Sequence, residues 1–319
     1  MMSARRRIRT VRVPVRGWGY GLLTIAIAGG LWFWLQPSST RKELRTLVFS
    51  AWSPGSRVGV ADVVADVWDA YLVPDPPLRS APLELGTYAL GGWPQPSGFR
   101  HGSITLLQNQ AYAAGWVDRL RCSAWVTYRV GGDAPALRSP PRPDRFVMDR
   151  RLSAPVKPED YVRTGFDRGH LAPNLAIGRW FGAEAQRETF LMSNVVPQAP
   201  ALNGGLWREI EARIAYSYPA RLEQVWVICG PLFDAEPKRL DRVGIALPSA
   251  FYLIVVDVSA GRVRTLALTL PQDLSKDMTL EAALTSVDAI ESQSGLDFLS
   301  LLEDEDERTI ESRRSYRVW

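Results

Sequence analysis

One of the two histidines in this chain lies in the stretch GFDRGHLAPN, residues 165–174. A free histidine titrates near pH 6.5, so a neutral His170 imidazole can accept a proton and is a candidate general base. Arg168 could contact a phosphate through paired hydrogen bonds. Gly169 allows a tight turn or the close approach of a ligand. Taken alone, the stretch is equally well interpreted as a turn around a buried histidine.

A second stretch, SNVVPQAPALNGGLWREIEARI (residues 193–214), places an amide and a carboxylate on a predicted amphipathic helix. Asn203 stands at its start, where an N-cap residue is expected. Glu211 follows eight residues later, about 12 Å along the axis, too far for both to bind one small ion directly. Side chains lean toward a helix N-terminus, so Glu211 could reach waters on a metal held by Asn203. An ordinary N-cap with a solvated glutamate is the alternative.

The apolar face of that helix consists of Leu206, Trp207, Ile210 and Ile214. Magnesium keeps several waters and needs few protein ligands, so a neutral oxygen with an outer carboxylate suits it.

Together, DRGHLAP, SNVVPQ and LNGGLWREIE resemble the DNA/RNA non-specific endonuclease family, whose active site has the ββα-metal architecture. The resemblance covers about residues 85–300, including VWVICGPLF, IALPSAFYLIVVD and SVDAIESQSGLDF. It implies an enzyme that hydrolyses phosphodiester bonds of DNA and RNA with Mg²⁺, or with Mn²⁺.

The resemblance also implies roles for the matched residues. His170 corresponds to the general base that activates water. Asn203 corresponds to the one side chain bound directly to the metal, and Glu211 to the carboxylate that holds metal-bound water.

Three further residues match supporting positions of the family. Arg168 corresponds to an arginine that stabilises the charged transition state, and Asn194 to a supporting amide. The family's upstream arginine falls within RPDRFVMD, where Arg142 is favoured and Arg145 is the alternative.

The elements that must position these residues predict an α+β fold with a central, largely antiparallel sheet and flanking helices. Runs rich in β-branched and aromatic residues predict strands at 102–108, 111–117, 122–130, 191–196, 224–233, 250–258 and 263–270. Helix-like spacing predicts helices at 183–190, 203–218 and 279–295. The charged residues 303–314 predict no regular structure.

The N-terminus predicts a membrane anchor. Residues 1–17 are basic without an acidic residue, and the uncharged residues 18–35 would span about 27 Å as a helix, close to the hydrocarbon core. The basic flank favours a cytoplasmic N-terminus, with the remainder in the periplasm or outside the cell. A cleaved signal peptide ending at AIAG is the alternative.

These predictions divide the chain into five parts. A basic segment (1–17) precedes a transmembrane anchor (18–36), a connector (37–84), a nuclease domain (85–302) and a charged tail (303–319). Within the connector, residues 40–52 and 59–73 have helical spacing, and a proline-rich segment follows.

The composition is globular and modestly basic, with a net charge of +4 and only four lysines. Arginine suits phosphate, but this bias alone does not establish a nucleic-acid partner. Two histidines and two cysteines lack the spacing of a structural zinc site. Cys122 and Cys229 predict either one disulfide or two buried thiols.

Two other function classes stay open at this stage. One is a catalytically idle nucleic-acid-binding envelope protein on the same fold, and the other is a phosphodiesterase for a small substrate. The oligomeric state is not predicted.

Overall fold

The computed structural model of the protein describes residues 27–36, 38–52, 58–71, 88–132, 136–259 and 262–319. The chain divides into two compact units, residues 1–45 and 46–319, and the second contains all the strands described below. Residues 27–35 are helical. Residues 18–26 of the predicted anchor lie outside the described ranges. Within those ranges, no helix has the length and apolar character needed to cross a membrane.

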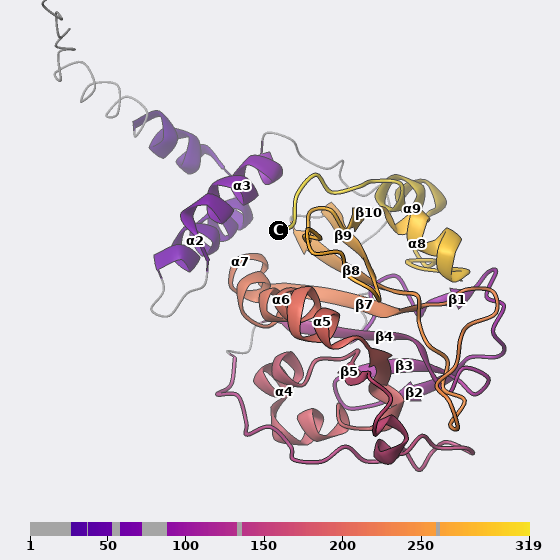
Figure 1. Ribbon diagram of the computed structural model, residues 1–319. Helices are drawn as coiled ribbons and strands as arrows, with labels where there is room; N and C mark the ends of the chain where they lie inside the picture. The colour runs from indigo at the N-terminus through magenta and orange to yellow at the C-terminus, as the bar shows by residue number, and fades with distance from the viewer. Residues whose placement is uncertain (1–26, 37, 53–57, 72–87, 133–135, 260–261) are drawn as a thin grey trace, which may run out of the picture. The chain divides into compact units, whose positions relative to one another are not determined.

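A seven-stranded antiparallel sheet forms the centre of the second unit (Figure 1), in the order β10-β9-β8-β7-β4-β3-β2. Its strands are β2 (Thr105–Gln108), β3 (Tyr112–Val117), β4 (Cys122–Gly131), β7 (Gln224–Leu232), β8 (Ala250–Ser259), β9 (Arg262–Pro271) and β10 (Leu284–Thr285). The predicted α+β class with a large antiparallel sheet and flanking helices is therefore confirmed.

Continuous burial along the central strands explains why their sequences read as apolar runs. Eight of the first nine residues of β4 are buried, as are eight consecutive residues of β7. Since successive side chains point to opposite faces, both faces of these strands are covered. Covering elements include α4 (Asn174–Glu188), which contacts β4, and α7 (Tyr218–Leu222), which contacts β4 and β7.

Two small antiparallel pairs complete the strands. β1 (Gln95–Pro96) pairs with β11 (Leu296–Asp297). β5 (Asp167–His170) pairs with β6 (Val195–Gln198), and this second pair holds the DRGH motif.

The predicted helix at residues 203–218 is longer and less regular than its sequence pattern suggested. It begins with α5 (Pro200–Leu202) and continues through α6 (Arg208–Ala212) to α7. Two π-helical turns, Asn203–Trp207 and Arg213–Ser217, separate these segments. The predicted apolar face is correct, since Trp207, Ile210 and Ile214 are buried.

Two predictions near the C-terminus are wrong. The helix expected at 279–295 is confined to α8 (Val287–Ser294), because Ser286 caps its N-terminus and residues 284–285 form β10 instead. The segment expected to lack structure contains the helix α9 (Asp304–Glu311). Four acidic residues fill the first turn of α9, where they favour the positive end of the helix dipole. Both helices contact β9.

The connector contains the two predicted helices, α2 (Ser38–Trp52) and α3 (Val60–Tyr71). Helix α3 is joined to the sheet unit by buried ion pairs. Asp66 lies 2.9 Å from both Arg221 and Arg317, and Asp69 also pairs with Arg317. We call these four residues the α3 ion-pair network.

The C-terminal residue is packed into the fold. Trp319 is 3% exposed, and the Arg264 guanidinium lies 4.5 Å from the centre of its ring. Its backbone oxygen accepts a hydrogen bond of 3.1 Å from Arg213 Nη1. The predicted tail is therefore part of the ordered unit.

Candidate active site

The β5–β6 pair and the helix that follows it form a ββα arrangement. His170 lies opposite Val195 in this ladder, and Gly169 opposite Val196. A Cβ atom on Gly169 would come within 2.3 Å of Gln198 Oε1, so only glycine permits this approach of strand and side chain. The predicted close approach at Gly169 is present, but with the protein's own side chain.

His170 is held in an aromatic setting. Its ring centroid lies 5.1 Å from that of Phe146 and 5.0 Å from that of Phe190. The side chain is 7% exposed, and Nε2 is buried without a hydrogen-bond partner. Burial and then the charge of Arg142 lower the pKa of His170 to about 3, so the imidazole is neutral at physiological pH.

Two arginines flank this aromatic group. The Arg168 guanidinium lies 5.0 Å from the centre of the Phe146 ring, and that of Arg142 lies 5.0 Å from the centre of the Phe190 ring. Of the two upstream candidates, Arg142 is the one whose charge lowers the pKa values of both His170 and Glu211. Arg145 is exposed.

Backbone pairing fixes the loop that carries Arg142 and Phe146. Val147 bridges to Leu191, with hydrogen bonds of 3.0 Å to the Phe190 oxygen and 2.9 Å from the Met192 nitrogen. Two residues later, the buried Asp149 accepts a hydrogen bond of 2.7 Å from the Ser193 hydroxyl.

Asp149 also forms an ion pair with Arg151. Burial alone would raise the pKa of Asp149, but hydrogen bonds from Arg151 and Ser193 lower it below its usual value. This carboxylate therefore stays charged and anchors the loop beside residues 190–194.

Asn194 is fully buried, and its backbone oxygen accepts a hydrogen bond of 3.0 Å from the nitrogen of Leu171, the residue after His170. Its side chain accepts a hydrogen bond from the Ala172 nitrogen (2.8 Å) and donates to the Ala172 and Thr189 oxygens (3.0 and 2.9 Å). These bonds occupy both N–H donors of the amide. The structure therefore places Asn194 where it fixes the backbone that leaves His170.

The two cysteines are buried free thiols, which resolves the choice between thiols and a disulfide. Cys229 Sγ lies 3.3 Å from the backbone oxygen of Leu171, to which its S–H donates. The thiol thus packs beneath the same segment that Asn194 holds.

Asn203 is inside the helix rather than at its N-cap, which corrects the sequence prediction. Its backbone is helical (φ −59°, ψ −45°), and its nitrogen donates to the Ala199 oxygen at 2.9 Å. The helix begins earlier because Pro200 is suited to its first position.

The Asn203 side chain is oriented by Asp167, the first residue of β5. Asn203 Nδ2 donates to Asp167 Oδ2 at 2.9 Å, so the amide oxygen is left for another partner. No local sequence pattern indicates this contact, because Asp167 and Asn203 lie 36 residues apart in the chain.

Glu211 lies on α6, beyond the first π turn. Its side chain is half-buried. Burial of the carboxyl raises its pKa to about 8, against the lowering effects of the Trp207 N–H, Arg142 and Arg208. The Trp207 N–H makes no hydrogen bond of normal geometry. Because Arg142 acts on both His170 and Glu211, the structure brings these three residues to one region.

This donor set fits a small, hard cation. The Asn203 amide oxygen is unengaged by Asp167, and the Glu211 carboxylate would be held charged by a neighbouring positive ion. Sequence reasoning missed Gln198 at the end of β6, which is fully buried with neither Nε2 nor Oε1 hydrogen-bonded. Its position as the last residue of the SNVVPQ motif could have indicated it as a site residue.

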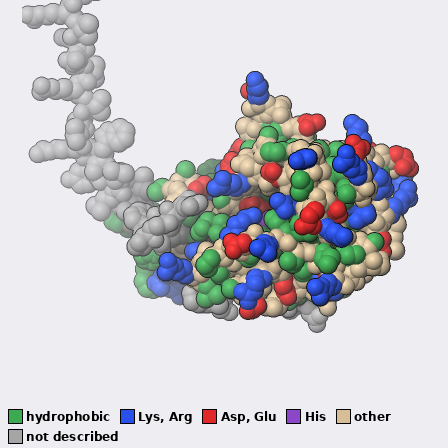
Figure 2. Space-filling model, turned by 60° about the horizontal axis from the view of Figure 1, so that its bottom comes forward, with side chains coloured by type: hydrophobic (Ala, Val, Ile, Leu, Met, Phe, Trp, Pro, Cys, Tyr) green, Lys and Arg blue, Asp and Glu red, His purple; other side chains and the backbone are tan. Residues whose placement is uncertain are grey.

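The surface charge is mixed. On the face drawn in Figure 2, basic side chains lie among acidic ones. An anionic ligand at this site would therefore be recognised by the two arginines beside His170, rather than by the modest net charge of +4.

Comparison with known proteins places this geometry in a family. Residues 97–305 match the family described as DNA/RNA non-specific endonuclease. A protein named "Nuclease" from Nostoc sp. is 28% identical over 273 residues, which cover 81% of this chain and 97% of that protein. The mitochondrial endonuclease G of Bos taurus is 28% identical over 298 residues, covering 87% of this chain and 92% of that protein.

A solved structure shares the fold. In a crystal structure of the EndoG/EndoGI complex, the matching chain superposes with a TM-score of 0.56 at 23% sequence identity, covering 65% of this chain and 90% of that one. The family match extends over more than half of the present chain. This protein is therefore a nuclease that belongs to the DNA/RNA non-specific endonuclease family.

Proposed function

We propose that this protein is a membrane-anchored, magnesium-dependent endonuclease that hydrolyses phosphodiester bonds in both DNA and RNA. The observation that carries the proposal is the buried, neutral His170, whose Nε2 has no hydrogen-bond partner. The His170 ring lies beside two phenylalanine rings, each of which has an arginine side chain stacked against it. A nitrogen kept unpaired in a buried setting is available to a substrate or water.

His170 is the proposed general base. It takes a proton from the water that attacks phosphorus. A pKa near 3 alone would make a weak base, but part of that lowering comes from the charge of Arg142. A phosphate bound by Arg142 and Arg168 offsets this charge, which raises the pKa of the imidazole as the substrate binds.

Asn203 and Glu211 are the residues proposed to hold the metal. Asp167 fixes the Asn203 amide so that its oxygen serves as the direct ligand, and Glu211 orients metal-bound water. When bound, Mg²⁺ supplies positive charge at the phosphate and at the leaving oxygen. Asn194 supports the site by holding the backbone after His170.

Weak sequence preference follows from these groups. Arginine forks recognise phosphate oxygens, which carry no sequence information. A site of this kind accepts the backbone of either nucleic acid, in line with the description of the family.

The proposed anchor is supported by the N-terminal sequence. Residues 18–35 are uncharged and follow a basic segment. Among the described residues of this stretch, Ile27, Leu31, Trp34 and Leu35 are exposed. We propose that the nuclease faces the periplasm or cell exterior. A reporter fused after Trp319 should be active only in its exported form, and activity confined to the cytoplasm would contradict this orientation.

Digestion of plasmid DNA and of RNA by the full chain, with Mg²⁺ or with EDTA, tests the function. Asn203→Ala should abolish cleavage beyond rescue by added Mg²⁺. Glu211→Gln should retain activity reduced about 10–100-fold and need more Mg²⁺, as losses around a metal's outer shell do. Glu209→Gln, on the same helix and paired with the partly exposed Arg213, is the matched control.

Binding of nucleic acid by the unaltered protein without cleavage in Mg²⁺ would instead indicate an idle binding protein. Equal activity of Asn203→Ala and the Glu209→Gln control would remove Asn203 as the metal ligand.

A further inference from the structure

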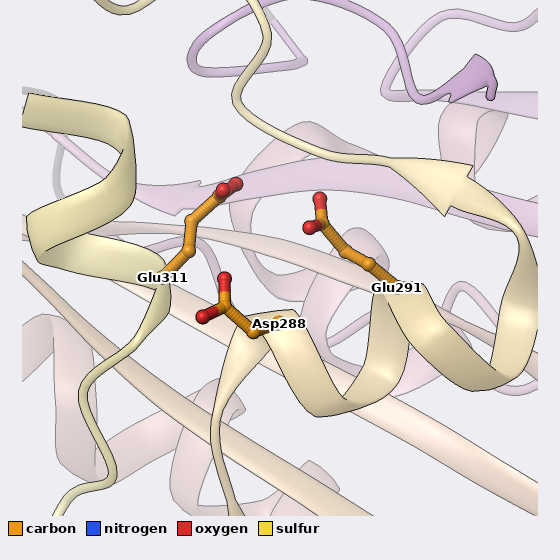
Figure 3. Close-up of side chains that lie close together, drawn as sticks. All are labelled: Asp288, Glu291 and Glu311. Atoms are coloured by element: carbon orange, nitrogen blue, oxygen red, sulfur yellow. The ribbon is translucent and has the colours of Figure 1, made fainter. Parts of the chain in front are cut away.

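Three carboxylates converge from two helices beside β9 (Figure 3). Asp288 and Glu291 lie one turn apart on α8, and Glu311 is the last residue of α9. One oxygen from each lies within 4.8 Å of the others. Within the described ranges, no other group of three histidine, cysteine, aspartate or glutamate residues brings its ligand atoms so close. We call these residues the α8–α9 carboxylate cluster.

Glu311 distinguishes this cluster from a solvated acidic patch. Its side chain is only 5% exposed, and its Oε1 is buried without a hydrogen-bond partner. Figure 3 shows this carboxylate directed toward the other two. A buried, unpartnered carboxylate oxygen is costly unless a cation or proton neutralises it.

The surroundings of the cluster add negative charge. Glu311 ends α9, where the helix dipole is itself negative. Glu307 on the same helix and Asp297 at the end of β11 add further carboxylates near Glu311. A bound cation would offset this accumulation of negative charge around a buried carboxylate.

We propose that the α8–α9 carboxylate cluster is a divalent-cation site of the calcium type that joins the two helices. Calcium binds carboxylate oxygens at about 2.3–2.6 Å, so ligands across the ion can be about 5 Å apart, whereas magnesium at about 2.1 Å brings them within about 4 Å. Three carboxylate oxygens within 4.8 Å of one another can therefore share one calcium ion. Asp288 is exposed, which leaves room for water ligands.

This site is separate from the candidate active site. Helices α8 and α9 contact β9, whereas the pair β5–β6 lies beside β4, three strands away in the sheet order. The cation would fix α9 and the segment after it, which ends in the buried Trp319. Its proposed role is structural.

Calcium binding to the full chain carrying Asn203→Ala tests the site, because that variant lacks the proposed active-site ligand. Calorimetry should detect one Ca²⁺ per chain. Ca²⁺ at ten times its Kd should raise Tm by about 3–6 °C relative to EDTA. Adding Glu311→Gln should weaken binding at least tenfold and remove most of the Tm response.

Two more variants keep the test decisive. Asp288→Asn changes an exposed side chain, so folding should be unaffected while Ca²⁺ binding weakens. Glu281→Gln removes an exposed carboxylate outside the cluster and should bind Ca²⁺ normally. Absence of Ca²⁺ binding in the Asn203→Ala parent would overturn the proposal. Unchanged affinity in both cluster variants would also overturn it.

Discussion

The α3 ion-pair network and the His170 site bury polar groups in opposite ways. In the network, the side chains of Asp66 and Arg221 are each 1% exposed and lie 2.9 Å apart, with Arg317 as a second cation beside Asp66. In the site, His170 Nε2 and both polar atoms of the Gln198 amide are buried without partners. Opposite charges offset burial in the first region, although Arg221 Nε has no hydrogen-bond partner, whereas the buried atoms of the second region belong to neutral groups left without hydrogen bonds.

This difference indicates which buried polar groups stabilise the fold and which serve the proposed reaction. Paired buried charges hold α3 and the C-terminal segment in place, so their loss should affect stability and leave activity per folded molecule unchanged. Unpaired buried groups do not stabilise the fold, so their loss should affect activity.

The largest expected effect is that of His170→Ala on cleavage. Loss of a general base should reduce the rate of plasmid nicking about 100–10,000-fold, while folding and DNA binding stay largely intact. Nicking rates, DNA-binding assays and thermal unfolding of the same preparation would check this. Near-normal turnover would exclude His170 from the mechanism, and the proposed difference between the α3 ion-pair network and the His170 site would then fail.

The next effect is that of Arg221→Met on stability. Breaking a buried pair typically costs 3–5 kcal/mol, and we expect about 3 kcal/mol because Arg317 still contacts Asp66. Urea unfolding would measure the loss. Glu209→Gln, which breaks only the partly exposed pair with Arg213, should cost about 0–1 kcal/mol.

Cleavage per folded molecule should be unchanged in both Arg221→Met and Glu209→Gln. A selective loss of cleavage in Arg221→Met, with stability intact, would mean that the network serves the site rather than the fold.

The third effect is a pH dependence of stability. The pKa of His170 is about 3 in the folded protein and near 6.5 when unfolded, so between these values the unfolded state binds more protons. The free energy of unfolding should therefore rise with pH between about 3 and 6.5, by less than about 1.4 kcal/mol per pH unit. Above pH 6.5, His170 should add no further pH dependence.

Urea unfolding of the unaltered protein and of His170→Ala across pH 4–8 would isolate this contribution, because the other titrating groups are common to both. A difference between the two proteins that does not change with pH would mean that the His170 imidazole is not held neutral by the fold.

The central strands were predictable from sequence because burial on both faces selects uninterrupted apolar runs, as in β7 and β8. Helix boundaries were less predictable. The residues after Asn203 carry no sequence pattern that predicts the π turns. The helix begins at Pro200 rather than at Asn203. The sequence of α9 resembles that of a charged tail, because only Asp306, Ile310 and Glu311 of its residues are buried.

The candidate site was predictable in its residue types but not in its contacts. The motifs contain His170, Arg168, Asn203 and Glu211, and their proposed roles stay predictions. The bond between Asp167 and Asn203 depends on how the helix crosses β5. The packing of Phe146 and Phe190 on His170 depends on a loop docked by Val147. Such contacts join segments that local sequence patterns describe only separately.

The π turn between Asn203 and Glu211 has a consequence for chain length. An α-helix advances about 100° per residue, so removing one residue from this turn would rotate Glu211 by that angle about the axis relative to Asn203. Gly204 and Gly205, inside the turn, have open space where a side chain would stand. Substitution at Gly204 is therefore sterically permitted, whereas deletion would carry the Glu211 carboxylate away from Arg142. Gly205 differs, because its backbone is non-helical within the turn (φ −104°, ψ −116°). The spacing, more than the identity of the intervening residues, is the quantity that this segment must keep.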